Sequence, residues 1–281
     1  MSPVRTGVLR VPGAGLHYAL RGSGPPLLIL PGGGGDADCA NPLTETLAAD
    51  FTVLTYDRRG QTRTTVDDPV AQKGIRQHAA DVHSLLTGLG LTDAMVFGSS
   101  TGAVIGLDLV RQHPDLIRRF IAHEPPLLSL LATEDREAVR GVVGQVDRLH
   151  REGGWQAVFR RMGQVLDVPL TDHTDHTAEV AWTPPTQRTS ANLDFFLTND
   201  FPATWQYQPD NQAWAELRAS APLITPAVSA HGLTRETLLA RSTRALADLL
   251  GTATVELPGG HDGYRTHPYS FATALRKVLA G

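Results

Sequence analysis

Short apolar segments alternate with amphipathic ones over most of the chain, and this alternation limits the possible folds more than any other feature. Most apolar segments are nearly continuous, which is typical of strands buried on both faces of a parallel sheet. The segment from Ile75 to Leu89 repeats apolar residues at helical spacing and predicts a helix with one buried face. The predicted fold class is α/β, with a mostly parallel sheet flanked by helices. Strands are predicted at residues 7–11, 16–20, 26–30, 51–56, 94–97, 117–122, 222–228 and 253–257.

The alternation stops after residue 126 and returns at residue 222. The segment between these points has amphipathic helical stretches and polar loops, without a convincing buried strand. We therefore predict an α/β core of residues 1–126 and 221–281, interrupted by a helical cap, or lid, of residues 127–220. Clustered tryptophans can line a pocket under such a cap or simply pack inside it. All four tryptophans of the chain fall in this insertion: Trp155, Trp182, Trp205 and Trp214.

Composition and charge exclude several classes of partner. The 281 residues are 41% hydrophobic and 19% charged, so the chain can form a sizeable core. The formal net charge of −4 argues against a nucleic-acid surface or a polybasic membrane surface. Cys39 is the only cysteine, which rules out an intramolecular disulfide. With no long apolar segment at the N-terminus or elsewhere, we expect a cytoplasmic protein, a monomer or a homodimer, with no membrane partner.

The most specific motif is Gly98-Ser99-Ser100-Thr101-Gly102, which has the form G-x-S-x-G. It stands between a predicted strand and a predicted helix, where this motif makes a sharp turn that exposes its serine. Side chains at the two glycine positions would collide with neighbouring backbone. We therefore predict that Ser100 is a nucleophile; the alternative is a chance turn rich in glycine and serine.

A serine hydroxyl needs a base that takes its proton. Of eleven histidines, His261 is the only one in the loop after the last predicted strand, and we predict that it is the base. His267 precedes a proline at a helix start, so we expect a surface or capping residue. His173 and His176 could suggest a metal pair, but without a third ligand in a matching context a solvated loop is the simpler interpretation.

The third member of such a triad is an acid that orients the histidine. That acid usually follows the strand predicted at residues 222–228, but no aspartate stands there, and Glu236 comes several residues later. Glu124 follows the strand after the nucleophile helix and leaves the sheet at its carboxyl edge. Neighbouring strand ends can present equivalent carboxylates to one histidine, so we predict Glu124 as the acid. Glu236 is the alternative acid, and Glu124 would then be a salt-bridged loop residue.

The glycines at positions 32 to 35 directly follow a buried strand. An oxyanion intermediate needs backbone N–H donors, and glycine lets the backbone approach the substrate closely. We assign one donor to Gly33 and the other to Thr101, and we expect Gly34 to contact the substrate. A phosphate-binding loop would need a lysine that is absent here. A dinucleotide site would need glycine where the chain has Ala37.

Together these motifs resemble those of α/β-hydrolases with a cap domain, over nearly the whole core. The family order of serine, acid and histidine is met by Ser100, Glu124 and His261. The resemblance to the zearalenone lactonase group is closer and implies a glutamate acid and a functional cap tryptophan, which Trp182 matches. It is carried by Gly98-Ser99-Ser100, by His123-Glu124-Pro125-Pro126, and by Leu257-Pro258-Gly259-Gly260-His261 with His267-Pro268.

The predicted function is that of a serine hydrolase that cleaves a small-molecule ester or lactone through an acyl-enzyme, with no metal or cofactor. A cofactor-free C–C hydrolase or a perhydrolase would use the same triad and remains an alternative. A ligand receptor without catalysis, on a hydrolase scaffold, is an alternative from another class. Haloalkane dehalogenation is disfavoured because it needs a carboxylate in place of Ser100.

Overall fold

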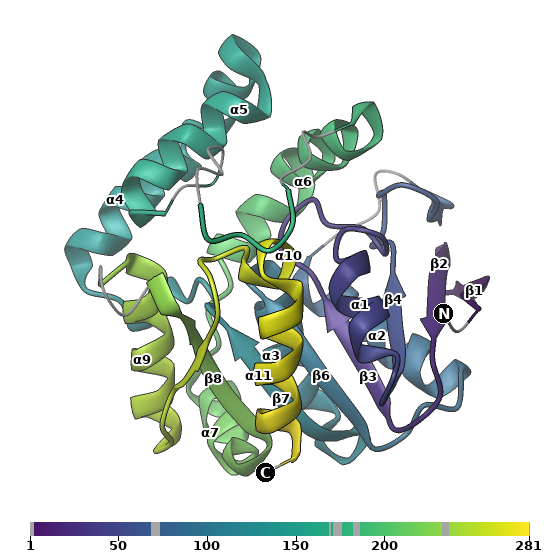
Figure 1. Cartoon of the computed structure of the whole chain (residues 1–281). Coiled ribbons are helices and arrows are strands. Elements are labelled where there is room, and N and C mark those ends of the chain that lie inside the picture. Colours follow the sequence, from purple (N-terminus) through teal and green to yellow (C-terminus); the bar gives the residue numbers. More distant parts are fainter. Residues whose placement is uncertain are drawn as a thin grey trace.

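The computed structural model describes residues 3–68, 74–168, 170, 176–181, 186–231 and 236–280. Within these residues nine strands form one sheet, in the order β1-β2-β4-β3-β6-β7-β8-β9, with β5 paired to β2 (Figure 1). The strands from β4 to β9 along this order are parallel, and β1 and β2 are antiparallel to their neighbours. The strands are β1 (Arg5–Val11), β2 (Ala14–Arg21), β3 (Pro26–Leu30), β4 (Thr52–Tyr56), β5 (Thr65–Val66), β6 (Ala94–Ser99), β7 (Ile117–His123), β8 (Ile224–Ser229) and β9 (Val255–Leu257).

Helices connect the parallel strands, and further helices lie above the sheet (Figure 1). The α-helices are α1 (Asn41–Leu47), α2 (Ile75–Gly88), α3 (Thr101–Gln112), α4 (Thr133–Val143), α5 (Val146–Leu166), α6 (Gln187–Trp205), α7 (Asn211–Ala219), α9 (Leu238–Leu250), α10 (Gly263–Thr266) and α11 (Pro268–Ala280). Short 3-10 turns lie at η1 (Pro114–Leu116), η2 (Leu128–Leu130) and η3 (Ala221–Leu223). The predicted α/β class is confirmed.

Both faces of the sheet are buried, as the nearly continuous apolar strands predict. Side chains alternate along a strand, so neighbours point to opposite faces. In β3, Leu28 and Leu30 join a core with residues of α2, α3, α7 and α9. Leu27 and Ile29 join a second core with residues of α1 and α11. This two-sided burial fixes the carboxyl ends of the parallel strands along one edge.

The helices α4, α5 and α6 lie above that edge (Figure 1) and share a third apolar cluster with η2 and the first turn of α9. The helix α7 packs instead against α3, and Trp214 belongs to the core that contains Leu28 and Leu30, on one face of the sheet. The segment 127–220 therefore contains one helix that belongs to the core packing, and its division as a cap domain stays a prediction. No helix within the described residues is both long enough and apolar enough to cross a membrane.

Candidate active site

Ser100 stands alone between a strand and a helix, because β6 ends at Ser99 and α3 begins at Thr101. Its backbone has φ 54° and ψ −121°, an uncommon conformation for a residue with a side chain. A Cβ at Gly98 would lie 2.6 Å from the carbonyl oxygen of Gly102, and one at Gly102 would overlap the carbonyl of Leu30. The two glycines therefore permit the sharp turn that presents Ser100.

Glu124 and His261 meet although they are far apart in sequence. The Oε2 atom of Glu124 lies 2.7 Å from Nδ1 of His261. The other oxygen, Oε1, accepts hydrogen bonds from the backbone N–H of Ser229 at 2.9 Å and from its hydroxyl at 2.6 Å. The carboxylate is only 1% exposed. The side chain of Glu236 is 65% exposed and pairs with Arg244, so the structure does not bring it to the histidine.

Both members of this pair have shifted pKa values. Burial raises the pKa of Glu124, but the hydrogen bond from His261, the charges of the His123 and His261 rings and the hydrogen bond from the Ser229 hydroxyl outweigh it, and the pKa is lowered. Burial lowers the pKa of His261, but the hydrogen bond to Glu124 and its negative charge raise that pKa above the ordinary value. The carboxylate therefore stays ionised, and the imidazole is a stronger proton acceptor than an isolated buried histidine.

The loop after β3 carries the two glycines assigned to the oxyanion and the substrate. Arg58 is buried and donates to the carbonyl oxygens of Pro31 at 2.8 Å and Gly32 at 3.0 Å, which fixes the start of this loop. A Cβ at Gly33 would overlap the ring of Phe196 in α6, so this position needs glycine for packing against that helix. Thr101 is the first residue of α3, and its N–H has no acceptor within its own helix.

A cavity of about 270 Å³ opens over these residues. Ser100, Thr101 and His261 line it together with Gly33 and Gly34, so the structure brings the predicted nucleophile, base and donors to one space. Its apolar wall comes mainly from α5 and α6. That wall contains Trp155, Phe159, Met162, Leu166, Leu193, Phe196, Phe201 and Trp205.

The tryptophans have different places. Trp155 and Trp205 line the cavity, whereas Trp214 packs in the core on one face of the sheet. Trp182, predicted to line the pocket, lies outside the described residues. Apart from the resemblance that singles out Trp182, the sequence does not distinguish the tryptophans, because the face of a helix that meets a cavity depends on how the helices pack.

The expectation for His267 as a capping residue is confirmed, because it is the C-cap of α10, but the alternative of a surface residue is wrong, since His267 is only 7% exposed. Its Nδ1 lies 2.9 Å from the Thr266 hydroxyl and its Nε2 lies 3.1 Å from that of Thr177. A Cβ at Gly259 would lie 2.6 Å from its ring, so His267 packs against the loop that carries His261. No local pattern indicates this burial, since it depends on contacts with distant segments.

His173 lies outside the described residues, and among those described no group of three or more histidine, cysteine, aspartate or glutamate side chains could hold a metal ion.

Two supporting residues were not predicted from the sequence: Ser229, which donates to Glu124, and Arg58, which donates to the loop after β3. For Ser229 a signal existed, because it ends β8, where an acid is usual.

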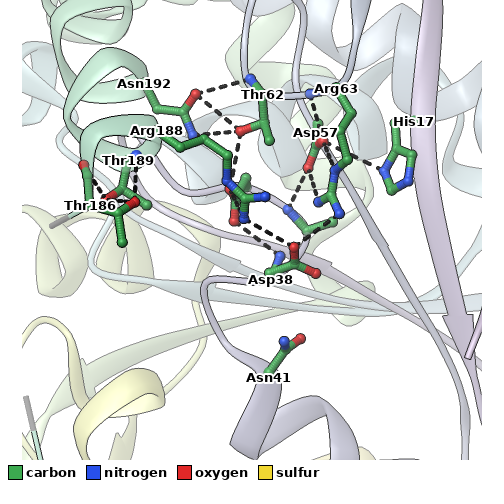
Figure 2. A network of polar contacts seen from close by, with 12 residues as sticks. His17, Asp38, Asn41, Asp57, Thr62, Arg63, Thr186, Arg188, Thr189 and Asn192 are labelled. Carbon is green, nitrogen blue, oxygen red and sulfur yellow. Dashed lines mark hydrogen bonds and ion pairs between the residues drawn. The ribbon is translucent and has the colours of Figure 1, made fainter. Parts of the chain in front are cut away.

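The helix α6 is attached to the core by polar contacts beside the cavity (Figure 2). Arg188, in its first turn, pairs with Asp36 at 3.3 Å and Asp38 at 3.2 Å. One turn later, Asn192 donates to the hydroxyl of Thr62 at 2.7 Å and accepts from the Thr62 backbone at 3.0 Å. These contacts hold α6 over the loops that follow β3 and β4.

Comparison with known proteins shows the family of this chain. The chain is 35% identical to the uncharacterized hydrolase YraK of Bacillus subtilis over 277 residues, which is 98% of this chain and 96% of the relative. It is 35% identical over 105 residues to RutD of Azorhizobium caulinodans, a protein named as a carbamate hydrolase, covering 37% of this chain and 39% of that one. The crystal structure of an alpha/beta hydrolase from Sphaerobacter thermophilus superposes with a TM-score of 0.69, at 21% identity, over 97% of this chain and 100% of the other. A family described as alpha/beta hydrolase fold matches residues 25–267, and the chain belongs to this family.

Proposed function

We propose that this hydrolase is a serine esterase or lactonase that works through an acyl-enzyme. The observation that carries the proposal is the 2.7 Å contact between buried Glu124 and His261, beside a cavity that Ser100 also lines. A buried carboxylate bound to Nδ1 leaves Nε2 free to accept a proton. Ser100 is the hydroxyl on the cavity wall that stands in the strained turn typical of a nucleophile.

The steps follow from these positions. Ser100 Oγ attacks the substrate carbonyl while His261 Nε2 takes the hydroxyl proton, and Glu124 stabilises the imidazolium that forms. The N–H groups of Gly33 and Thr101 donate to the oxyanion. The imidazolium then gives its proton to the leaving alcohol, and water attacks the acyl-enzyme with His261 again as the base.

The cavity favours an apolar substrate of modest size. Aromatic and aliphatic side chains of α5 and α6 form most of its wall, and such walls bind by excluding water from apolar groups. A ring-bearing ester or a lactone fits this surface, and the lactone is also what the resemblance to zearalenone lactonases implies. Carbamate esters belong in the test panel, because the partial relative RutD is named for carbamate hydrolysis.

The test is turnover of p-nitrophenyl esters and of a lactone panel read by mass spectrometry, with covalent labelling by a fluorophosphonate. We expect the Ser100→Ala variant to melt like the parent, to lose labelling, and to lose about 10⁴-fold or more in kcat. An alanine variant that keeps a tenth of the activity would remove Ser100 from the mechanism. Cleavage of C–C substrates in preference to every ester would favour the C–C hydrolase. Binding of ligands without any turnover would favour the receptor.

A further inference from the structure

The cavity wall has two chemically different parts. The helices α5 and α6 supply the aromatic and aliphatic part. The loop that carries His261 supplies a charged part, through Asp262 and Arg265. Arg265 is the only lysine or arginine among the described residues that line the cavity. A substrate that fills the apolar part therefore leaves its remaining groups next to a guanidinium.

The backbone ties Arg265 to the position of His261. Arg265 lies in α10, four positions after the histidine, and its N–H donates to the carbonyl oxygen of Asp262 at 2.8 Å. The turn is tight, because a Cβ at Gly263 would overlap the carbonyl oxygen of Pro258. The guanidinium is thus carried by the same short turn as the predicted base, and its stem begins at a fixed place.

The guanidinium of Arg265 has unfilled donors. It forms no hydrogen bond or ion pair with another described side chain, and Arg265 is exposed to solvent although it lines the cavity. The neighbouring arginines differ: Arg58 donates to two carbonyl oxygens, and Arg188 pairs with two carboxylates. A guanidinium offers five N–H donors in a planar fork that matches a carboxylate.

The surrounding charges keep Arg265 protonated without satisfying it. Desolvation by the wall opposes its charge, but the carboxylate of Asp262 and, more weakly, that of Asp36 raise its pKa. Asp36 already accepts from Thr62 and pairs with Arg188. Neither carboxylate forms an ion pair with Arg265, so the fork can still take a carboxylate from the cavity side.

We propose that the natural substrate is an ester or lactone that carries a free carboxylate, which binds Arg265 while the apolar part of the molecule lies against α5 and α6. This inference rests on the proposed serine hydrolase function. Arg265 is a residue that determines specificity: it binds a group of the substrate away from the bond that breaks.

The experiment compares pairs of esters that differ only in charge. One pair is the p-nitrophenyl monoester of glutaric acid and the same ester with a primary amide in place of the carboxylate. A second pair, the butyrate esters of p-hydroxybenzoate and p-hydroxybenzamide, places the charge on the alcohol side. The measured quantity is the ratio of kcat/KM for the anionic ester to that for the neutral ester. In at least one pair, we expect Arg265→Gln to lower this ratio about 10- to 100-fold.

Two further variants sharpen the result. Asp262→Asn removes a competing negative charge and is expected to raise the same ratio. Arg118→Gln makes the same charge change as Arg265→Gln at the exposed, opposite end of β7 and is expected to leave the ratio within twofold of the parent. If Arg265→Gln also leaves the ratio within twofold in both pairs, the carboxylate proposal is overturned.

A binding measurement separates this proposal from the proposed function. The affinities of the same ester pairs are measured by calorimetry in Ser100→Ala, with and without Arg265→Gln. Tighter binding of the anionic ester that disappears with Arg265→Gln supports the proposal even without turnover. Equal affinities, or no binding of either ester, overturn it. A parent protein that turns over no ester and takes no fluorophosphonate label would instead overturn the serine hydrolase function.

Discussion

Glu124→Gln tests the predicted acid, because the structure dictates how the new amide must turn. The N–H and the hydroxyl of Ser229 both donate to Oε1 of Glu124. In the variant the amide oxygen takes that place, so the NH₂ group faces Nδ1 of His261. Nδ1 must then accept, and the ring proton moves to Nε2, which can no longer take a proton from Ser100.

Two losses set the size of the effect. Turning the amide over restores the productive tautomer but sets NH₂ against the N–H of Ser229, and an unsatisfied buried donor costs about 1–3 kcal/mol. The imidazolium also loses the charge-assisted hydrogen bond that its Nδ1–H donates to Glu124, worth about 1.5–3 kcal/mol. Since about 1.4 kcal/mol is tenfold in rate, the two losses together lower kcat by about 10²–10⁴.

The assay is kcat and KM for a p-nitrophenyl ester against pH, with Tm measured alongside. In the parent, kcat/KM rises with pH as His261 loses its proton, and Glu124 raises that pKa above the ordinary value. Without the charge of Glu124, burial alone lowers the pKa, so the acid limb shifts to lower pH. The control is Glu236→Gln, an exposed glutamate, expected to change kcat by only a few fold at most. A Glu124→Gln enzyme within tenfold of the parent, with an unshifted acid limb, would refute the reasoning.

Two substitutions test the contacts that support the loop after β3, which carries the proposed oxyanion donor Gly33. Arg58→Lys replaces the fork that holds the carbonyl oxygens of Pro31 and Gly32, so we expect kcat to fall about 10- to 100-fold with a smaller change in KM. A parental kcat in a variant with parental Tm would contradict this role. Gly33→Ala sets a Cβ against Phe196, so the free energy of unfolding in urea should drop by about 1–3 kcal/mol, and by less in a Phe196→Ala background. Equal losses in the two backgrounds would show that the contact is not the cause.

The sequence could predict which edge of the sheet carries Ser100 and Glu124, because each of these residues directly follows a strand. Ser100 follows β6 and Glu124 follows β7, and the carboxyl ends of parallel strands share one edge. The alternation of Leu27, Leu28 and Ile29 between the two cores likewise follows from a simple period of two. Such features depend on local patterns, which a single sequence contains.

Other features depend on contacts between distant segments, and the sequence could not predict them. The burial of His267 comes from Thr177 and from the loop at Gly259, which lie elsewhere in the chain. Trp205 and Trp214 lie in similar sequence contexts, but Trp205 lines the cavity and Trp214 packs in the core on one face of the sheet. The helix α10 has only four residues, too short for a helical period to appear.

Gly33 and Gly34, in the loop after β3, line the cavity and also pack closely against α6. A Cβ at Gly33 would overlap Phe196, and one at Gly34 would overlap Leu193, one turn earlier in α6. Gly60, after β4, meets the same helix as closely. The large side chains of α6 thus fill the space beside these three glycines, which have no side chains of their own. Phe196 and Leu193 also line the cavity, so the apolar cavity wall and the backbone proposed to stabilise the oxyanion form one packed unit. A change in α6 that alters substrate choice is therefore expected to displace the proposed oxyanion donors, because close-packed groups transmit small displacements.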